Sequence, residues 1–397
     1  MSKKAAKKVT QEIETIEIPS ELQQRSKLGI QQAKREMRKT TRTKRFLKNI
    51  AVVAAGIVLA VALGAATSPT FASFVKSLVS AVDAIKEVDF EEVDQKYVDA
   101  AKKAIEQHSN GKAFKLDKVQ KHDNHYVFET KMSEDFLRSD VSVYVDAKTG
   151  EVFHINLRFK ADEVTGSYKE YVESAQSAVK QINSKSTFQV NEMQYNWFKG
   201  GIEQFRFYGD DKDNKYQQYI ELEAETNKVL GYRINFKPAD VDEAIISAAE
   251  KAVKSIPNTT LEPFTRAIKV KFNESEEERW VVGKITEHTN NYGSTYVNEK
   301  ESTFATIGEK SGKVYEVNVP RETQYEENQL TNEQIVAIAK PVVQEVLGVD
   351  LSNYEPKSDS QWGGYQFSSP GKETIRIGIH NNGHLHSIEL AGQSNWR

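Results

Sequence analysis

Cysteine is absent from the 397 residues of the chain. The protein can therefore form neither a disulfide nor a thiolate metal site, and its fold must rest on packing alone. The sequence also lacks the patterns that identify common reactions. It contains no HExxH helix, no glycine-rich phosphate loop and no serine elbow. These absences predict a protein without a catalytic site.

The distribution of charge divides the chain into a basic head and an acidic body. The net charge of −3 combines +8 in residues 1–46 with −11 in the remainder. A chain of this length exceeds what one hydrophobic core covers, so we expect several domains of roughly 75 to 150 residues.

Charged residues are also absent between Lys48 and Lys76. Residues 50–66 read IAVVAAGIVLAVALGAA, which is long enough to cross a hydrocarbon core as a helix. We therefore predict a transmembrane helix within residues 47–75. Basic residues gather on its N-terminal side, which predicts a single-pass protein of the cell membrane with a cytoplasmic N-terminus and an extracellular bulk. The alternative is a signal peptide cleaved near Ala72.

The basic tail, residues 1–46, contains a short amphipathic pattern. Ser20 and Gln23 have the spacing of a helix capping box. A thin apolar stripe follows, which includes Leu22, Ile30 and Met37. This stripe predicts docking on a cytoplasmic protein partner. In the alternative interpretation the basic charges only set the membrane topology.

The region after the apolar segment contains an internal repeat. Residues 144–160 (YVDAKTGEVFHINLRFK) align without a gap with residues 221–237 (ELEAETNKVLGYRINFK), and shorter copies occur at 308–319 and 375–390. Each copy places Gly or Asn, which accept a positive φ, between two alternating apolar runs. The predicted hairpin turns are Thr149 and Gly150, Thr226 and Asn227, Ser311 and Gly312, and Asn382 and Gly383.

A helical pattern precedes each predicted hairpin. Apolar residues recur at helical spacing in 93–107, 168–182, 241–256 and 332–347, and Pro341 should kink or split the last helix. The sequence predicts an α+β protein of tandem small units, each with one helix packed on an antiparallel sheet. The predicted units span 76–160, 161–238, 239–320 and 321–397, the last being divergent.

These units resemble the PepSY-type domains of metallopeptidase propeptides and of cell-envelope proteins. The resemblance rests on a hairpin signature with Asp146, Thr149, Gly150 and Val152 in the first unit, which later units keep in part. It implies a repeat protein of the Gram-positive cell envelope, with binding or inhibitory modules that act on peptidases or on the envelope.

The N-terminal part is similar to membrane-anchored anti-sigma factors. A basic helix, one apolar span and the following segment Ser68-Pro69-Thr70-Phe71-Ala72 carry this resemblance, which covers about seventy residues. It implies an anti-sigma-like regulator that relays an outer signal across the membrane.

The remaining polar clusters predict neither a metal site nor a cofactor. His380, His384 and His386 flank the last turn, but no acid or cysteine completes a ligand set. We expect a membrane-anchored extracytoplasmic binding or regulatory protein that is not an enzyme. Its expected partners are the membrane, a peptide, peptidase or envelope polymer outside the cell, and a protein in the cytoplasm, but no nucleic acid. A transmembrane regulator and an extracellular hydrolase are the alternatives.

Overall fold

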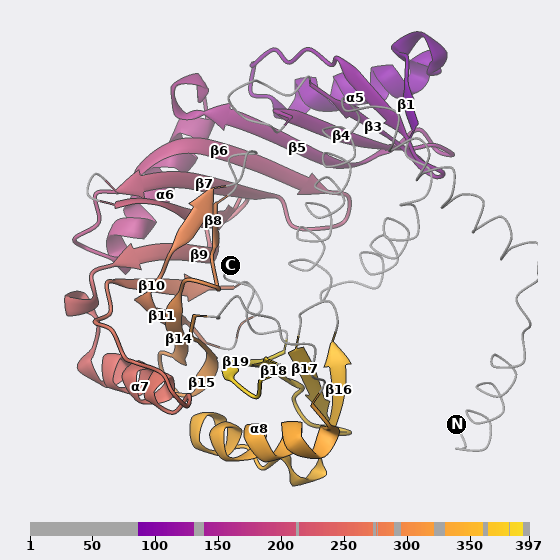
Figure 1. Ribbon diagram of the computed structural model, residues 1–397. Helices are drawn as coiled ribbons and strands as arrows, with labels where there is room; N and C mark the ends of the chain where they lie inside the picture. Colours follow the sequence, from indigo (N-terminus) through magenta and orange to yellow (C-terminus); the bar gives the residue numbers. More distant parts are fainter. Residues whose placement is uncertain are drawn as a thin grey trace, which may run out of the picture. The chain divides into compact units, whose positions relative to one another are not determined.

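The computed structural model of this protein describes residues 86–130, 139–211, 214–272, 275, 277–289, 295–320, 330–359, 364–380 and 382–391. All of these residues belong to one compact unit of the chain, Ala84–Arg397. Figure 1 shows the helices and strands of this unit.

Four α-helices and nineteen strands occur in the described residues. The helices are α5 (Gln95–His108), α6 (Tyr168–Ile182), α7 (Glu243–Lys254) and α8 (Asn332–Leu347). The first strands are β1 (Lys86–Val88), β2 (Lys118–Lys121), β3 (His125–Glu129), β4 (Val141–Asp146), β5 (Val152–Lys160), β6 (Gln189–Phe198), β7 (Gln204–Asp211), β8 (Asn214–Glu223) and β9 (Val229–Phe236). The others are β10 (Arg266–Lys271), β11 (Arg279–Lys284), β12 (Glu287–Thr289), β13 (Thr295–Val297), β14 (Thr303–Gly308), β15 (Val314–Asn318), β16 (Glu355–Asp359), β17 (Gly364–Ser368), β18 (Ile375–Ile379) and β19 (Leu385–Leu390).

Seventeen strands form one antiparallel sheet, and β12 and β13 form a separate hairpin. Strands β1 to β9 pair in chain order, followed by β10, β11, β14 and β15. β15 then pairs with β19, so that β18, β17 and β16 follow in reverse order. The expected fold class, tandem PepSY-like units each with its own small sheet after a transmembrane helix, is therefore wrong. The reason is that the pairs β5–β6, β9–β10 and β15–β19 join the strands of the predicted units into one sheet of seventeen strands.

The helices begin where the sequence provides capping groups. The carboxylates of Asp94 and Asp242 accept from the second N–H of α5 and α7, and Thr331 forms a capping box with Gln334 at α8. Pro341 lies inside α8 and does not split it, so that of the two predicted outcomes, a kink or a split, the split is excluded. The helix continues because its apolar face is packed, with Ile335, Ala339, Val342, Val343 and Val346 buried.

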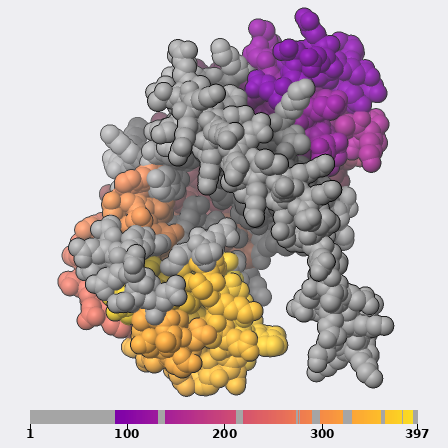
Figure 2. Space-filling model, turned by 45° about the vertical axis from the view of Figure 1, so that its right-hand side comes forward, coloured from indigo at the N-terminus to yellow at the C-terminus, as the bar shows by residue number. Residues whose placement is uncertain are grey.

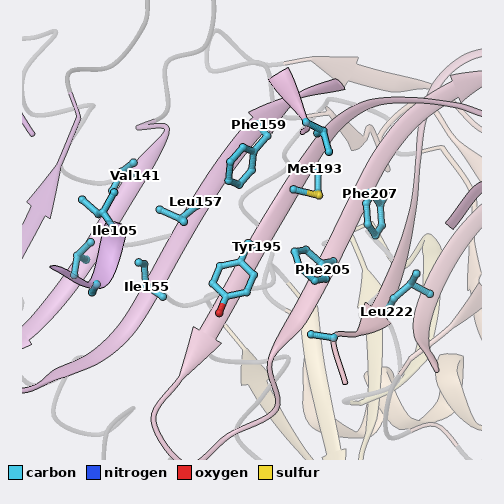
Figure 3. Packing of buried hydrophobic residues seen from close by; sticks show 14 of the residues in the cluster. Ile105, Val141, Ile155, Leu157, Phe159, Met193, Tyr195, Phe205, Phe207 and Leu222 are labelled. Carbon is cyan, nitrogen blue, oxygen red and sulfur yellow. The ribbon is translucent and has the colours of Figure 1, made fainter. Parts of the chain in front are cut away.

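One apolar core lies between helices α5 and α6 and the sheet. Alternate residues of β4 to β8 point to this side, because successive strand side chains point to opposite faces. Figure 3 shows the packed side chains, among them Leu157, Phe159, Met193, Tyr195, Phe205 and Leu222. Full burial of an aliphatic or aromatic side chain of this size contributes about 1.5–3 kcal/mol.

A second core lies under α7 and α8, on the same face of the sheet. Phe236 in β9 pairs with Ala267 in β10, and directly paired residues share a face. Phe236 packs against both cores, which are thereby joined across the β9–β10 pair. The segment that carries α8 is coloured orange in the space-filling view (Figure 2). All four helices therefore cover one face, and the opposite face, which we call the helix-free face, carries no helix among the described residues.

The membrane assignment concerns residues that lie outside the described part of the chain. These are the basic tail with Leu22, Ile30 and Met37, and the apolar stretch 50–66. Among the described residues, no helix combines the length and apolar character needed to span a bilayer. This finding contradicts the predicted localisation as a single-pass membrane protein with an extracellular bulk.

The structure places the four predicted turn pairs at strand connections or next to them. Gly150, Asn227, Gly312 and Gly383 have positive φ values of 74°, 58°, 64° and 83°. The residue before each of them accepts a backbone N–H two positions ahead of itself, as in Thr149 Oγ1 from Glu151. In the first two turns a helix tyrosine also binds the turn: Tyr97 and Tyr171 donate to the carbonyl oxygens of Ala147 and Ala224.

Asp146 stabilises the first of these turns. Its Oδ1 accepts from the N–H groups of Lys148 and Thr149, at 2.9 and 2.8 Å, and from Thr149 Oγ1. Desolvation raises the pKa of Asp146, but these hydrogen bonds outweigh it and the pKa is lowered. The stabilisation is thus present above pH 3.8, the ordinary pKa of an aspartate. It is lost as the pH falls through the lower pKa that Asp146 has in the folded chain.

We expect Asp146→Ala to lower the free energy of unfolding by about 1–2 kcal/mol, since three hydrogen bonds to one charged group are removed. Urea unfolding at pH 7 measures the change. The control Asp162→Ala removes an exposed carboxylate from the short helical turn that follows β5 and should change stability by less than about 0.5 kcal/mol. Equal effects of the two substitutions would contradict the role assigned to Asp146.

Candidate functional site

Polar and aromatic side chains occupy the helix-free face over strands β2 to β9. They alternate along each strand with the apolar residues of the core, as Asn156 and Arg158 do with Leu157 and Phe159 in β5. Because paired residues lie side by side, the register arranges them in rows that cross the strands.

The first feature of this face is a ladder of stacked rings. His122 and His125 stack with ring centroids 4.3 Å apart and planes inclined by 7°. His125 is followed by Tyr144 at 5.9 Å, Tyr144 by His154 at 4.7 Å, and His154 by Phe198 at 3.9 Å. We call these five residues the aromatic ladder. It connects the end of β2 with β6 across β3, β4 and β5.

The three histidines of the ladder are neutral at pH 7. Burial lowers the pKa of His125 and of His154 from 6.5 to about 3, and burial also lowers the pKa of His122. Nδ1 of His125 lies 2.7 Å from Oδ1 of Asn124. A carbonyl oxygen only accepts, so Nδ1 carries the proton and Nε2 keeps its lone pair.

The second feature is a set of polar rows across β5 to β8. The amides of Asn156 and Asn196 bond at 2.6 Å. Arg158 and Glu192 form an ion pair at 2.8 Å between β5 and β6, and Arg206 pairs with Glu221 between β7 and β8. The side chains of the two ion pairs are half-buried and that of Asn196 is buried, and they hold one another in fixed positions.

The third feature is a buried ionic cluster where the β12–β13 hairpin meets the sheet. The carboxylate of Glu287 in β12 contacts the guanidinium groups of Arg233 in β9 and of Arg266 in β10, the latter at 2.8 Å. Arg266 also donates to Oδ1 of Asn235 at 2.7 and 3.1 Å. Ile285, just before the hairpin, and Val297, at its end in β13, pack with Ile268, Val270, Val281 and Phe304 of the sheet. The cluster and this small apolar core together fasten the hairpin to the helix-free face.

A further polar cluster lies on the helix-covered face. The hydroxyl of Tyr195 lies 2.6 Å from Nδ1 of His108 and donates to Glu203 at 2.8 Å. Such a group would need a lowered pKa to act as a nucleophile. Burial and the hydrogen bond to Glu203 instead raise the pKa of Tyr195, and burial lowers that of His108. The cluster therefore lacks an activated hydroxyl.

The C-terminal histidines come together only in part. The rings of His380 and His386 lie 4.7 Å apart, and those of His380 and His384 lie 6.4 Å apart. In the described part of the chain, no three His, Asp or Glu side chains are grouped so that they could hold a metal ion.

The predicted turns lie beside the site rather than in it. Hydrogen bonds between neighbouring connections place the turns at 149–150, 226–227 and 311–312 along one end of the sheet. The turn at 382–383 lies at the opposite end, because the last four strands are attached through β19. The ladder begins close to the first turn, where Ala147 N–H donates to Asn124.

Sequence reasoning did not find the ladder or the ionic cluster. Arg233 and Glu287 are 54 positions apart, and no local pattern connects them. A signal was present in the alternation of polar and apolar residues in 189–198 and 204–211, which shows that one face of each strand is polar.

Comparison with known proteins does not assign the chain to a family. No protein-family model matches the chain, and searches of curated proteins and of solved structures find no significant similarity.

Proposed function

We propose that this chain is a non-enzymatic binding protein that docks a protein partner on the helix-free face between β4 and β9. The observation that supports the proposal is the set of cross-strand rows of arginine, tyrosine, amide and carboxylate groups on this face. The opposite face is occupied by helices and is closed to a ligand of this size.

The composition of the face fits a protein interface. Protein interfaces are enriched in tyrosine and arginine, which combine large contact areas with hydrogen-bond donors, and are depleted in lysine. The register places these residues on the face: Tyr144, His154, Asn156, Arg158, Glu192, Gln194, Asn196, Arg206, Tyr208, Tyr219 and Glu221. A partner would meet charges of both signs, so complementary polar groups rather than one strong charge would select it.

The side chains of the face are held in place before a partner arrives. Arg158 and Arg206 are fixed by their carboxylates, and Tyr208 donates to Gln194 at 3.3 Å. Binding therefore requires little further loss of side-chain freedom, which favours affinity.

The size of the face also suits a stable complex. Six strands of about eight residues cover about 750 Å², from a strand spacing of about 4.8 Å and a rise of about 3.3 Å per residue. A standard interface buries about 800 Å² on each partner.

The ends of the sheet are less suited to binding by strand addition, the mode expected for an envelope peptide. β1 at one end has only three residues, and β16 at the other contains Pro356, which has no N–H to donate. We therefore assign binding to the face and not to an edge.

The double variant Arg206→Ala/Tyr208→Ala should weaken partner binding about 30-fold to 1,000-fold, since two interface residues at about 1–2 kcal/mol each are removed. The wild-type chain, immobilised at full length, captures the partner, and titration calorimetry with the purified partner measures the affinities of the variants.

The matched control is Lys102→Ala/Lys103→Ala, which removes two exposed side chains from α5 on the other face. It should bind like wild type, and both variants should keep the circular dichroism spectrum of the wild type. Unchanged affinity of the face variant, or retention of a polysaccharide instead of a protein, would refute the proposal.

A further inference from the structure

The aromatic ladder crosses strands that are already joined by backbone hydrogen bonds. Some of its rings are imidazoles, which can acquire a positive charge. Three of its five members are histidines, contributed by the end of β2, by β3 and by β5. Near-parallel rings at 4.3 Å and 3.9 Å are in full van der Waals contact, so a charge on one ring is added inside the stack.

We propose that the aromatic ladder is an acid-sensitive latch, which holds β2 to β6 together while its imidazoles are neutral and opens this part of the sheet when they are protonated. The latch does not depend on the proposed partner, because it is a property of the chain alone.

Protonation of the ladder histidines would create N–H groups for which no hydrogen-bond acceptor is in place. Nε2 of His125 and Nε2 of His154 are both buried without a hydrogen-bond partner. A proton on either nitrogen would create a buried N–H without an acceptor as well as a buried charge. His122 and His125 would in addition repel each other if both were protonated, and this repulsion already lowers the pKa of His125.

The neighbouring carboxylates favour protonation but do not outweigh burial. Asp123 faces His122, and Asp146 faces His125 from the end of β4. Glu129 in β3 acts on Tyr144 in the middle of the ladder. The Asp146 carboxylate is engaged by the N–H groups of its own turn, so it does not move toward the imidazole.

At the other end of the ladder, His154 packs between Tyr144 and Phe198. Lys199, which follows Phe198 in the chain, forms an exposed ion pair with Glu151 at 2.7 Å, so the two charges offset each other. Burial is the cause that lowers the pKa of His154.

The direction of the pH effect follows from linkage. The folded-state pKa values of these histidines lie below the ordinary 6.5, so their contribution to stability is complete above about pH 6.5 and declines as the pH falls. With folded values of about 3, lowering the pH from 7 to 5 raises the equilibrium constant for opening about 25-fold for each of His125 and His154. For both together the increase is several hundred-fold.

Hydrogen exchange of the full-length chain, read by mass spectrometry and corrected for the intrinsic pH dependence, measures this opening in β3, β4 and β5. We expect protection in these strands to fall several hundred-fold from pH 7 to pH 5. The double variant His125→Phe/His154→Phe keeps the rings but cannot be protonated at either position, and its protection should change less than 10-fold. The control His288→Phe alters an exposed histidine and should behave like wild type.

Imidazole NMR of the wild-type chain provides a second measurement that needs no variant. His125 and His154 should stay neutral until well below pH 5 or until the strands open. Titration of His125 and His154 near pH 6.5 in the folded chain, or the same acid opening in the double phenylalanine variant, would overturn the latch.

Discussion

Replacement of Gly283 by alanine is expected to lower the free energy of unfolding by at least about 3 kcal/mol. Gly283 lies in β11 between β10 and β14, opposite Phe304. A Cβ atom at this position would lie 2.0 Å from the carbonyl oxygen of Thr303 and 2.6 Å from Cα of Phe304. Because these are backbone atoms, the strands must separate to admit the methyl group. Urea unfolding followed by tryptophan fluorescence measures the loss.

The matched control is Gly201→Ala, in the connection between β6 and β7. The nearest atom to a Cβ there is Cβ of Phe198 at 3.2 Å, and the backbone does not have a positive φ. Its effect should remain within about 1 kcal/mol. Similar losses of stability for the two alanine variants would show that the close approach of the neighbouring strand to Gly283 is not the cause of the loss.

Removal of the Glu287 carboxylate is expected to have the second large effect. Glu287→Ala takes away a carboxylate that contacts both Arg233 and Arg266, in a place where the side chains of all three are less than 10% exposed. Loss of one member of a buried ionic network typically costs about 3–5 kcal/mol, because the desolvated opposite charges lose their compensation. The hairpin β12–β13 should detach first, which hydrogen exchange detects as lost protection in residues 285–289.

Glu262→Ala is the control for this substitution. Glu262 pairs with Lys284 at the surface, with 56% of its side chain exposed, and exposed pairs contribute at most about 1 kcal/mol. A loss below about 1 kcal/mol for Glu287→Ala would mean that the small apolar core of Ile285 and Val297 holds the hairpin without the ionic cluster.

The helices were accessible to sequence analysis because their signals are local. The range predicted for α6, 168–182, agrees with the structure, and those for α5 and α7 differ from it by one or two residues at each end. Apolar spacing of three and four residues determines which side of a helix packs. The continuation of α8 through Pro341 could not be predicted from the local sequence, because it depends on the packing of α8 on the last strands, which offsets the hydrogen bond that proline removes.

The sheet was not accessible in the same way. Each strand pattern indicates that a partner is needed but does not identify the partner, so separate small sheets and one long sheet predict the same alternation. The reversed attachment of the last four strands depends on the pairing of Glu316 with Glu389 and of Val317 with Ile388. Those residues are more than 70 positions apart, and no turn between them sets the register.

The amino-acid sequence by itself determined the local elements: where the helices are capped, and where Gly or Asn accepts a positive φ in a turn. Only the tertiary structure decided which strands pair, which face is covered by helices, and which polar side chains meet on the other. Local elements follow from forces between residues a few positions apart. The aromatic ladder and the Arg233–Glu287–Arg266 cluster exist because pairing across the sheet brings distant residues into one row, and that pairing depends on the packing of the whole core.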